Sequence, residues 1–413
     1  MGKWVGLLAK KLAPWPRVQM IGNLVKWLLI GMMTGILTGT SSAALLATLD
    51  WATAWREAHG QTGLLLPVGG LVSGLIYHYL GKRVEAGQNL LLEEIHQPQQ
   101  VIPWQMAPLV FVGTTISHLC GASVGREGTA VQMGTAIVDR LTLLWRLDNG
   151  DRRILLMAGI SGGFGSVFGT PLAGMVFGLE VSTVGSFRHE GLFPCLIAAM
   201  IGDRITLAWG LQHQVYLVPL VPALTITGIF MAIGAGVVFG LTARVFTTLT
   251  HRIGDYFKAH IHYSPLRPLI GGTAIAIALQ LVGTTKYMGL GLPTIARAFD
   301  AQVSPGDFIA KIGFTALSLG SGFKGGEVTP LFYIGATLGQ AISTILPLPA
   351  PLLAGMGFVG VFAGAANTPL AATLMAIELF GASTGSYAGI ACVVSYLCSG
   401  HAGIYRAQRR GAD

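Results

Sequence analysis

An arginine and a glutamate stand side by side in the stretch Gly125-Arg126-Glu127-Gly128, with apolar residues on both sides. Ionisable side chains in such surroundings are rare and usually functional. The glycines permit a sharp turn, and residues 129–143 can form a helix whose first N–H groups attract anions. Glu127 could fill that anion site as a carboxylate and leave it when protonated, so we predict a proton-linked gate with Arg126 balancing charge. The alternative is a structural Arg–Glu pair that caps a helix.

A second glycine turn, GGEVTP at 325–330, has the same construction. Its proline can occupy the first turn of a helix, where no backbone hydrogen bond is lost. Thr329 would offer a hydroxyl at the helix start, beside Val328 and Glu327. A plain N-cap role for Thr329 is the alternative.

Two further places supply polar groups near glycines. Gln88 and Asn89 follow Gly87, and their amide groups are neutral hydrogen-bond donors that suit an anion. An ordinary loop would also explain them. Tyr405 precedes a basic tail, a position typical of tyrosines at a membrane interface.

The elements that must position these residues are membrane helices. The 413-residue chain is 52% hydrophobic and only 11% charged, with a mean hydropathy of +0.63, whereas soluble proteins carry roughly 25% charged residues. Four windows are long enough to cross a hydrocarbon core of about 30 Å: 21–47, 216–243, 268–283 and 351–380. We therefore expect an all-α polytopic membrane protein.

Basic residues gather at both ends of the chain, in residues 1–20 and 406–413. The positive-inside rule then predicts that both ends are cytoplasmic, and no cleavage site indicates that a signal peptide is removed. The net charge of +8 is explained by these tails beside anionic lipid, so no nucleic-acid partner is expected.

The chain contains an internal repeat. TPLAGMVFGLE at 170–180 returns as TPLAATLMAIE at 368–378, and the glutamate and threonine of GREGT return 200 residues later in GGEVT. Two landmarks at nearly one offset indicate a duplication. We expect one membrane domain, 21–405, with repeat one at about 21–210 and repeat two at about 216–405. The 58 glycines and 19 prolines favour broken helices around a site between the halves.

An enzyme within the membrane is the alternative from a different class, and enzymatic function is not expected. Ser117, His118 and Ser123 lie in a membrane segment, but no nucleophile turn accompanies them. His189-Glu190 begins like a zinc motif, yet Phe193 stands where the second histidine is required. We expect no metal and no cofactor, and the four cysteines, which form no C-x-x-C pair, are expected to be small buried residues.

At these residues the chain resembles the CLC family of anion channels and anion/proton antiporters. Gly125 to Gly128 is similar to that family's gating-glutamate motif, residues 325–330 to its third anion-binding segment, and Tyr405 to its central-site tyrosine. The resemblance implies two inverted-topology repeats whose broken helices meet at a central anion site. It also implies a homodimer with one pathway per subunit.

The departures from chloride-handling members resemble the fluoride/proton antiporter branch. Those members have Gly-Ser-Gly-Ile-Pro where this chain has Gly87-Gln88-Asn89-Leu90-Leu91, proline at the position of Thr129, and apolar residues where it has Glu327 and Thr329. Chloride antiporters also carry a second acid where Val181 falls. The resemblance implies a fluoride exporter of the bacterial plasma (inner) membrane that admits protons and confers fluoride resistance.

The resemblance to this branch implies a role for each candidate site residue. Glu127 would be the proton-linked gate, and Glu327 a second essential carboxylate that receives or positions it. The anion-binding set would be Thr329, Val328, Tyr405, Gln88, Asn89, Gly125 and Gly128. Added donors suit fluoride, because stripping its water demands more replacement hydrogen bonds. A chloride/proton antiporter, a passive anion channel of the same fold and a carrier of another anion remain alternatives.

Overall fold

The computed structural model describes residues 16–60 and 62–411. The predicted cytoplasmic lysines at 3, 10 and 11 lie outside this range. The helices of the first half are α2 (Pro16–Ala58), α3 (Leu66–Leu80), α4 (Gln88–His96), α5 (Met106–Cys120), α6 (Glu127–Val138), α7 (Arg140–Trp145), α8 (Asn149–Phe168), α9 (Pro171–Glu180) and α10 (Leu192–Ala208). Those of the second half are α11 (Ile226–His260), α12 (Leu266–Val282), α13 (Leu292–Asp300), α14 (Asp307–Ser321), α15 (Val328–Ile342), α16 (Ala350–Ala366), α17 (Pro369–Phe380) and α18 (Gly385–Cys398).

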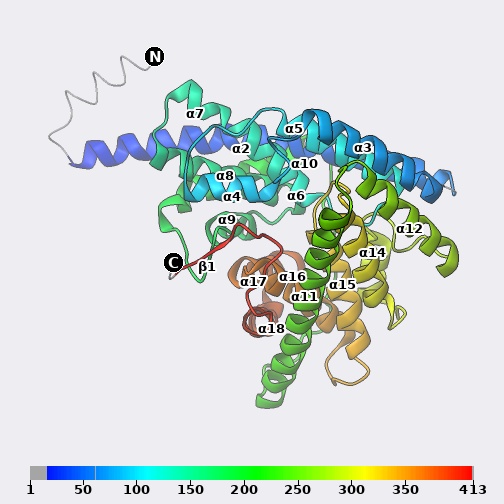
Figure 1. The fold of residues 1–413 in the computed structure, drawn as a ribbon. Helices are drawn as coiled ribbons and strands as arrows, with labels where there is room; N and C mark the ends of the chain where they lie inside the picture. The colour runs from blue at the N-terminus through cyan, green and yellow to red at the C-terminus, as the bar shows by residue number, and fades with distance from the viewer. Residues whose placement is uncertain (1–15, 61, 412–413) are drawn as a thin grey trace.

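Strand structure in the described part of the chain is one short parallel pair. β1 (Thr183–Val184) pairs with β2 (Arg409–Arg410). This pair ties the basic C-terminal segment to the connection between α9 and α10, and Figure 1 shows the C-terminus beside β1.

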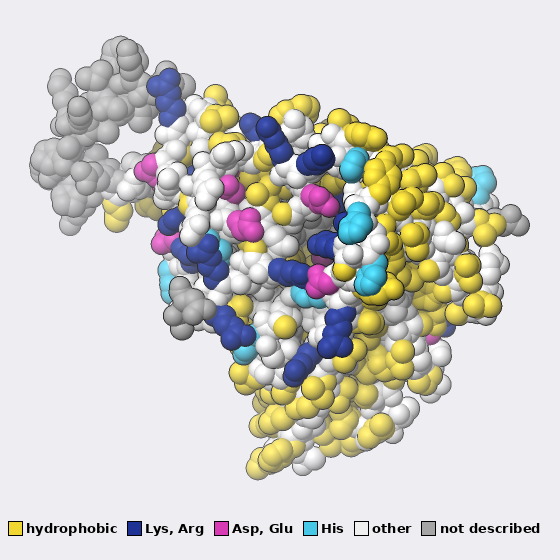
Figure 2. All heavy atoms as spheres, viewed as in Figure 1, with side chains coloured by type: hydrophobic (Ala, Val, Ile, Leu, Met, Phe, Trp, Pro, Cys, Tyr) yellow, Lys and Arg dark blue, Asp and Glu magenta, His cyan; other side chains and the backbone are white. Residues whose placement is uncertain are grey.

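The expected all-α membrane architecture is confirmed. Within the described residues, four helical segments are long and apolar enough to cross a membrane: Met20–Ala58, Thr62–Leu80, His189–Ala208 and Ile226–His260. Large apolar side chains such as Phe230, Ile277 and Leu281 are exposed on α11 and α12. Figure 2 shows the hydrophobic surface along the lower and right-hand edges, whereas Lys, Arg, Asp and Glu gather in the middle and left of this face. This pattern suits a protein surrounded by lipid.

The structure differs from two of the expected spans. The window 351–380 contains two helices, because α16 ends at Ala366 and α17 begins at Pro369. Between them Asn367 adopts a left-handed conformation (φ 56°), which ends a helix. Proline at the first helical position then starts the next one. A single crossing by this window is therefore wrong.

The window 216–243 is helical only in its later part, and the helix continues beyond the window to His260. α11 begins only at Ile226, with the Thr225 hydroxyl accepting a hydrogen bond from Gly228 N at 3.1 Å. Residues 211–225 are irregular and include Pro219 and Pro222, which cannot donate to a helix. Likewise the helix expected over 129–143 begins at Glu127 and ends at Val138, with α7 following.

The duplicated Thr-Pro-Leu-Ala motif joins the two halves. Glu180, at the end of α9, accepts hydrogen bonds from Leu370 N and Ala371 N at 3.1 and 2.9 Å. Glu378, near the end of α17, accepts from Leu172 N and Ala173 N at 2.9 and 2.8 Å. Each glutamate thus satisfies N–H groups in the first turn of the other copy's helix. We call this pair of contacts the reciprocal clasp.

The main hydrophobic core contains residues of both halves, and α16 is buried in it from Leu352 to Ala366. Phe358 of α16 stacks on Phe332 of α15 with ring centroids 3.9 Å apart. This packing fixes α15, the helix that begins at the second glycine turn, against the centre of the molecule.

Candidate functional site

The two glycine turns predicted from the repeat meet directly. Gly125 N donates to Gly326 O at 2.6 Å, and Gly326 N donates to Gly125 O at 2.8 Å. A methyl group on Gly128 would lie 3.2 Å from Gly326 Cα, and one on Gly125 would lie 2.8 Å from Glu127 Oε2. A side chain at either position would crowd the facing backbone or the carboxylate, so glycine suits this close approach. This short bridge brings the first turns of α6 and α15 together.

Glu127 is the first residue of α6, yet its carboxylate lies at the start of α15. Its side chain is 1% exposed. Glu127 Oε1 accepts a hydrogen bond from the Thr329 hydroxyl, while Oε2 accepts from Thr329 N at 3.2 Å and from Arg126 N at 3.1 Å. Backbone N–H groups at a helix start attract anions. The carboxylate therefore occupies a place suited to a free anion.

Arg126 lies beside this carboxylate, as expected. Its Nε is 3.7 Å from Glu127 Oε1, and its guanidinium also lies 4.0 Å from Asp50 Oδ1. The arginine thus partly balances the buried charge from the side.

Thr329 is not the N-cap of α15. That position is held by Glu327, which makes no side-chain capping bond, and the helix begins at buried Val328. Thr329 lies in the first turn and gives both its hydroxyl and its amide to Glu127. A plain N-cap interpretation of Thr329 is therefore wrong.

A cavity of about 570 Å³ reaches the site from the charged face. Gln88, Asn89, Glu327 and Tyr405 all line it, so four of the predicted residues share one space. Glu127 is not among its lining residues. Instead Glu127, Arg126 and Thr329 line a separate pocket of about 20 Å³. In this conformation the Glu127 carboxylate faces the small pocket and Glu327 faces the cavity.

The turn before α4 has the conformation that its glycine predicts. Gly87 has φ 58° and ψ −124°, outside the range of most residues. Gln88 is buried and its Nε2 has no hydrogen-bond partner in the described structure. Asn89 Oδ1 accepts from Ala407 N at 3.0 Å, which joins α4 to the segment that carries Tyr405. Gln88 therefore offers a free buried donor, while Asn89 holds α4 to the segment that forms the neighbouring part of the cavity wall.

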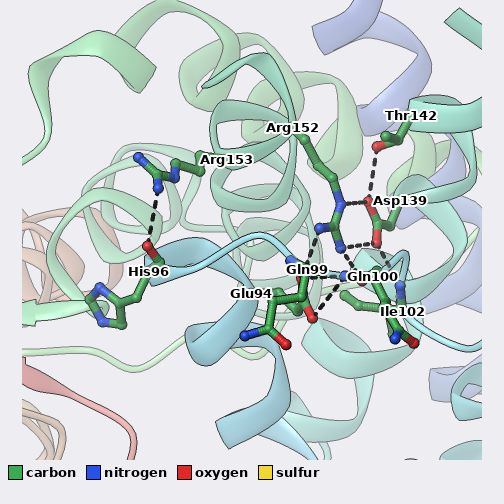
Figure 3. A network of polar contacts seen from close by, with 9 residues as sticks. All are labelled: Glu94, His96, Gln99, Gln100, Ile102, Asp139, Thr142, Arg152 and Arg153. Carbon is green, nitrogen blue, oxygen red and sulfur yellow. Dashed lines mark hydrogen bonds and ion pairs between the residues drawn. The ribbon is translucent and has the colours of Figure 1, made fainter. Parts of the chain in front are cut away.

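A buried ionic network holds the opposite end of α4 (Figure 3). Arg152 of α8 donates to Asp139 Oδ2 and to Glu94 Oε2, both at 2.8 Å, and Asp139 Oδ2 also accepts from Ile102 N at 2.8 Å. Arg153 donates to His96 O at 3.1 Å. Because Glu94 lies on α4, the network anchors the helix that begins at Gln88. No residue pattern in the sequence indicates this network.

Three residues near the site were also missed. Gln132 and Lys324 line the cavity, and Tyr216 lines the small pocket beside Glu127. Gln132 follows the gate motif by one helical turn and could have been noticed. Tyr216 lies in the window 216–243, which was expected to be a membrane span. No sequence pattern indicated that it would lie in the irregular segment instead.

The residues considered for an enzyme do not converge. Ser117 Oγ donates to Gly113 O within its own helix at 3.0 Å, and Ser123 Oγ shares a hydrogen bond with Thr315 Oγ1 at 2.8 Å. All four cysteines are described and unpaired, with Cys398 half-buried and the others buried. Among the described residues no group of three His, Cys, Asp or Glu side chains could hold a metal ion.

The fold and site define an integral membrane protein of two related halves, with broken helices that meet at a buried polar centre. Residues 69–400 match the family described as voltage gated chloride channel. The chain belongs to this family, which consists of transporters and channels and not of enzymes.

Relatives of known structure or name agree with this assignment. The chain is 52% identical over 401 residues to a chloride/fluoride channel protein of Pseudomonas syringae pv. tomato, covering 96% of this chain and 89% of that protein. A crystal structure of a CLC-type fluoride/proton antiporter aligns with a TM-score of 0.91 and 32% identity, covering 94% of this chain and 98% of the other. A H(+)/Cl(-) exchange transporter of Vibrio cholerae is 27% identical over 85% of this chain and 80% of its own length. The CLC-type fold expected from the sequence is confirmed.

Proposed function

We propose that this protein is a fluoride/proton antiporter that exports cytoplasmic fluoride in exchange for protons. The observation that carries the proposal is the Glu127 carboxylate, bound by Thr329 across the two halves of the chain. A side-chain anion there competes with a permeating anion for the same donors. The likeness to a CLC-type fluoride/proton antiporter supports the same function.

Glu127 acts as the gate in this proposal. As a carboxylate it fills the start of α15; once protonated it binds the N–H groups less strongly. It then leaves the site, and an anion takes its place beside Thr329. One proton therefore moves with the event that admits the anion.

Glu327 is the second carboxylate of the exchange cycle. It lines the cavity, and it belongs to the same turn as Thr329. We infer that it receives or positions Glu127 after the gate swings away. Tyr405 closes the cavity side of the pathway, which it lines together with Gln88 and Asn89.

Neutral donors favour fluoride over chloride in this site. Fluoride is smaller than chloride and loses more hydration energy when it enters the site, so it needs more hydrogen bonds in return. A buried polar group left without a partner costs about 1–3 kcal/mol. Gln88 offers such a donor, because its buried Nε2 has no partner in the described structure. Thr329 adds a hydroxyl, and Gly125 and Gly128 let the backbone approach the site.

The cellular arrangement follows from charge and family. We infer a bacterial inner-membrane protein with both termini in the cytoplasm, since residues 1–20 and 406–413 are basic. The membrane domain would span 21–405, with repeats at about 21–210 and 216–405. The assembly would be a homodimer with one pathway in each subunit, and its role would be fluoride resistance.

A passive anion channel is the second candidate, because the Pseudomonas syringae relative is named a chloride/fluoride channel protein. A chloride/proton antiporter is the third. The experiment is fluoride efflux from proteoliposomes, followed with a fluoride electrode while internal pH is recorded. Fluoride loss with matching acidification supports the antiporter. Fluoride loss without proton movement indicates a channel, and faster chloride than fluoride movement contradicts fluoride selectivity.

Glu127→Gln tests the gate in the same assay. The amide cannot carry the proton, so proton movement should stop even if fluoride still passes. Retained coupling in this variant would remove Glu127 from the proposed role.

A further inference from the structure

Lys324 lies in the wall of the large cavity, directly before the glycine turn at Gly325 and three residues before Glu327. Its Nζ lies over the Tyr77 ring, 4.0 Å from the centroid. A methyl group on Gly113 would lie 3.0 Å from both Cβ and Cγ of Lys324, so glycine in α5 leaves room for the lysine stem. The surrounding helices therefore hold this cation in place.

Lys324 has no carboxylate partner within ion-pair distance in the described structure. Other cations of the cavity wall are engaged: Arg406 donates to Asp255 at 2.9 Å, and Arg267 donates to Ile261 O at 2.9 Å. Lys82 and Lys258 are exposed at the protein surface. Lys324 is half-buried, and the Tyr77 ring is a neutral neighbour. Its ammonium group keeps N–H donors for a ligand in the cavity.

An anion in this cavity meets a carboxylate before it reaches the gate. Glu327 lines the same space, and two like charges close together repel each other strongly away from bulk water. A fixed cation on the wall offsets this repulsion and raises the local concentration of anions. Lys324 is placed to do so, since only Gly325 and Gly326 separate it from Glu327.

We propose that Lys324 forms an anion subsite in the large cavity, where a small hydrated inorganic anion binds before it enters the gated site. The proposal rests on the proposed fluoride exchange and adds a loading step to it. Charge-assisted hydrogen bonds of the ammonium replace part of the anion's water. The subsite is separate from the Thr329 site, which Glu127 fills in this conformation.

The first test is the fluoride dependence of exchange in Lys324→Gln. Loss of one charge-assisted contact is expected to raise the half-saturating fluoride concentration about tenfold. The maximal rate and the fluoride-to-proton ratio should stay close to those of the unaltered protein, because the gate is intact. Lys324→Arg should restore the half-saturation. Lys258→Gln removes a charge from the exposed rim and should change it less than twofold.

The second test restores the charge chemically. Lys324→Cys is prepared with Cys398→Ser, because the other three cysteines are buried. A thiol reagent that adds a positively charged aminoethyl group should return the half-saturation toward the original value. A neutral reagent of similar size should not. This comparison uses one folded sample before and after labelling, so a folding defect cannot imitate the result.

Three outcomes would overturn the subsite. They are an unchanged half-saturation in Lys324→Gln, an equal effect of Lys258→Gln, and equal effects of the charged and neutral reagents. Failure of the proposed function looks different, because the unaltered protein would then exchange no protons for fluoride.

Discussion

Two threonines occupy matching positions after the two glutamates of the repeat, yet they have different partners. Thr329 binds the Glu127 carboxylate through its hydroxyl and its amide. Thr129 is buried, and its hydroxyl shares a 2.7 Å hydrogen bond with Thr114 of α5. The donor in the second half therefore binds the proposed gate, and the donor in the first half holds α6 against its neighbour.

Thr329→Val is expected to reduce fluoride exchange about 10- to 100-fold. The change removes a hydrogen bond to a charged group, which is worth about 1.5–3 kcal/mol, while the shape of the side chain is preserved. The amide donor remains, so transport should fall without being abolished. Initial fluoride efflux from proteoliposomes measures the effect.

Thr129→Val is the matched control for this variant. It removes an equally buried hydroxyl at the same offset from the other glutamate, so it should lower stability by about 1 kcal/mol and leave efflux within a factor of two or three. Equal losses of transport in both variants would show that Thr329 acts only through packing.

Among the helices, the reciprocal clasp explains why the repeat ends in glutamate. Glu180→Gln or Glu378→Gln leaves two N–H groups of the opposite helix with a weaker acceptor. Each change should destabilise the protein by about 1 kcal/mol, the usual size of a helix cap. Thermal unfolding in detergent measures the loss.

Glu190→Gln is the control for the clasp. Its side chain is 56% exposed and pairs with Arg188 at 3.4 Å, so its removal should change stability by less than about 0.5 kcal/mol. Melting temperatures of Glu180→Gln and Glu378→Gln that match the control would refute the clasp as a stabilising contact.

The Arg152 network should be far more sensitive. Arg152→Gln leaves Asp139 and Glu94 buried without their cation, at a cost of about 3–5 kcal/mol. Asp151→Asn removes the partly exposed pair with Lys26 and should cost less than about 1 kcal/mol. Thermal unfolding of the two variants compares them, and similar losses would contradict a dominant role for the buried network.

The sequence predicted elements well where a local signal existed. The two glycine turns at 125–128 and 325–330, the duplicated motif and the helices that follow these two turns were all visible as residue patterns. Long apolar windows were less informative, since hydropathy does not register the left-handed Asn367 or the irregular segment 211–225. The network at Arg152 could not be found, because Glu94, Asp139 and Arg152 lie far apart in the chain and only tertiary packing unites them.

In the whole molecule, each half supplies part of one site. The proposed gate, Glu127, comes from α6, the donors that bind its carboxylate come from α15, and part of the cavity wall comes from α4 and the segment around Tyr405. The repeat offset predicted that the halves would be related. The resemblance to the CLC family predicted which residues form the site between them. The pairing of Gly125 with Gly326 could not be predicted from spacing alone.

The proposed homodimer makes a prediction at this scale. Light scattering in detergent should give a protein mass of about twice 43.3 kDa, the mass of one chain. If the protein has the mass of one chain and still exchanges fluoride for protons, the dimer is contradicted and the proposed pathway stays intact.

Coupling itself is tested most directly by uphill transport. Proteoliposomes hold equal fluoride inside and outside, the membrane voltage is clamped to zero, and the outside is made more acidic. An antiporter must then expel fluoride against a growing gradient as protons enter, and Glu127→Gln must not. Protein-free liposomes report leakage of hydrogen fluoride. Fluoride that stays level in the presence of the unaltered protein would contradict proton-coupled export.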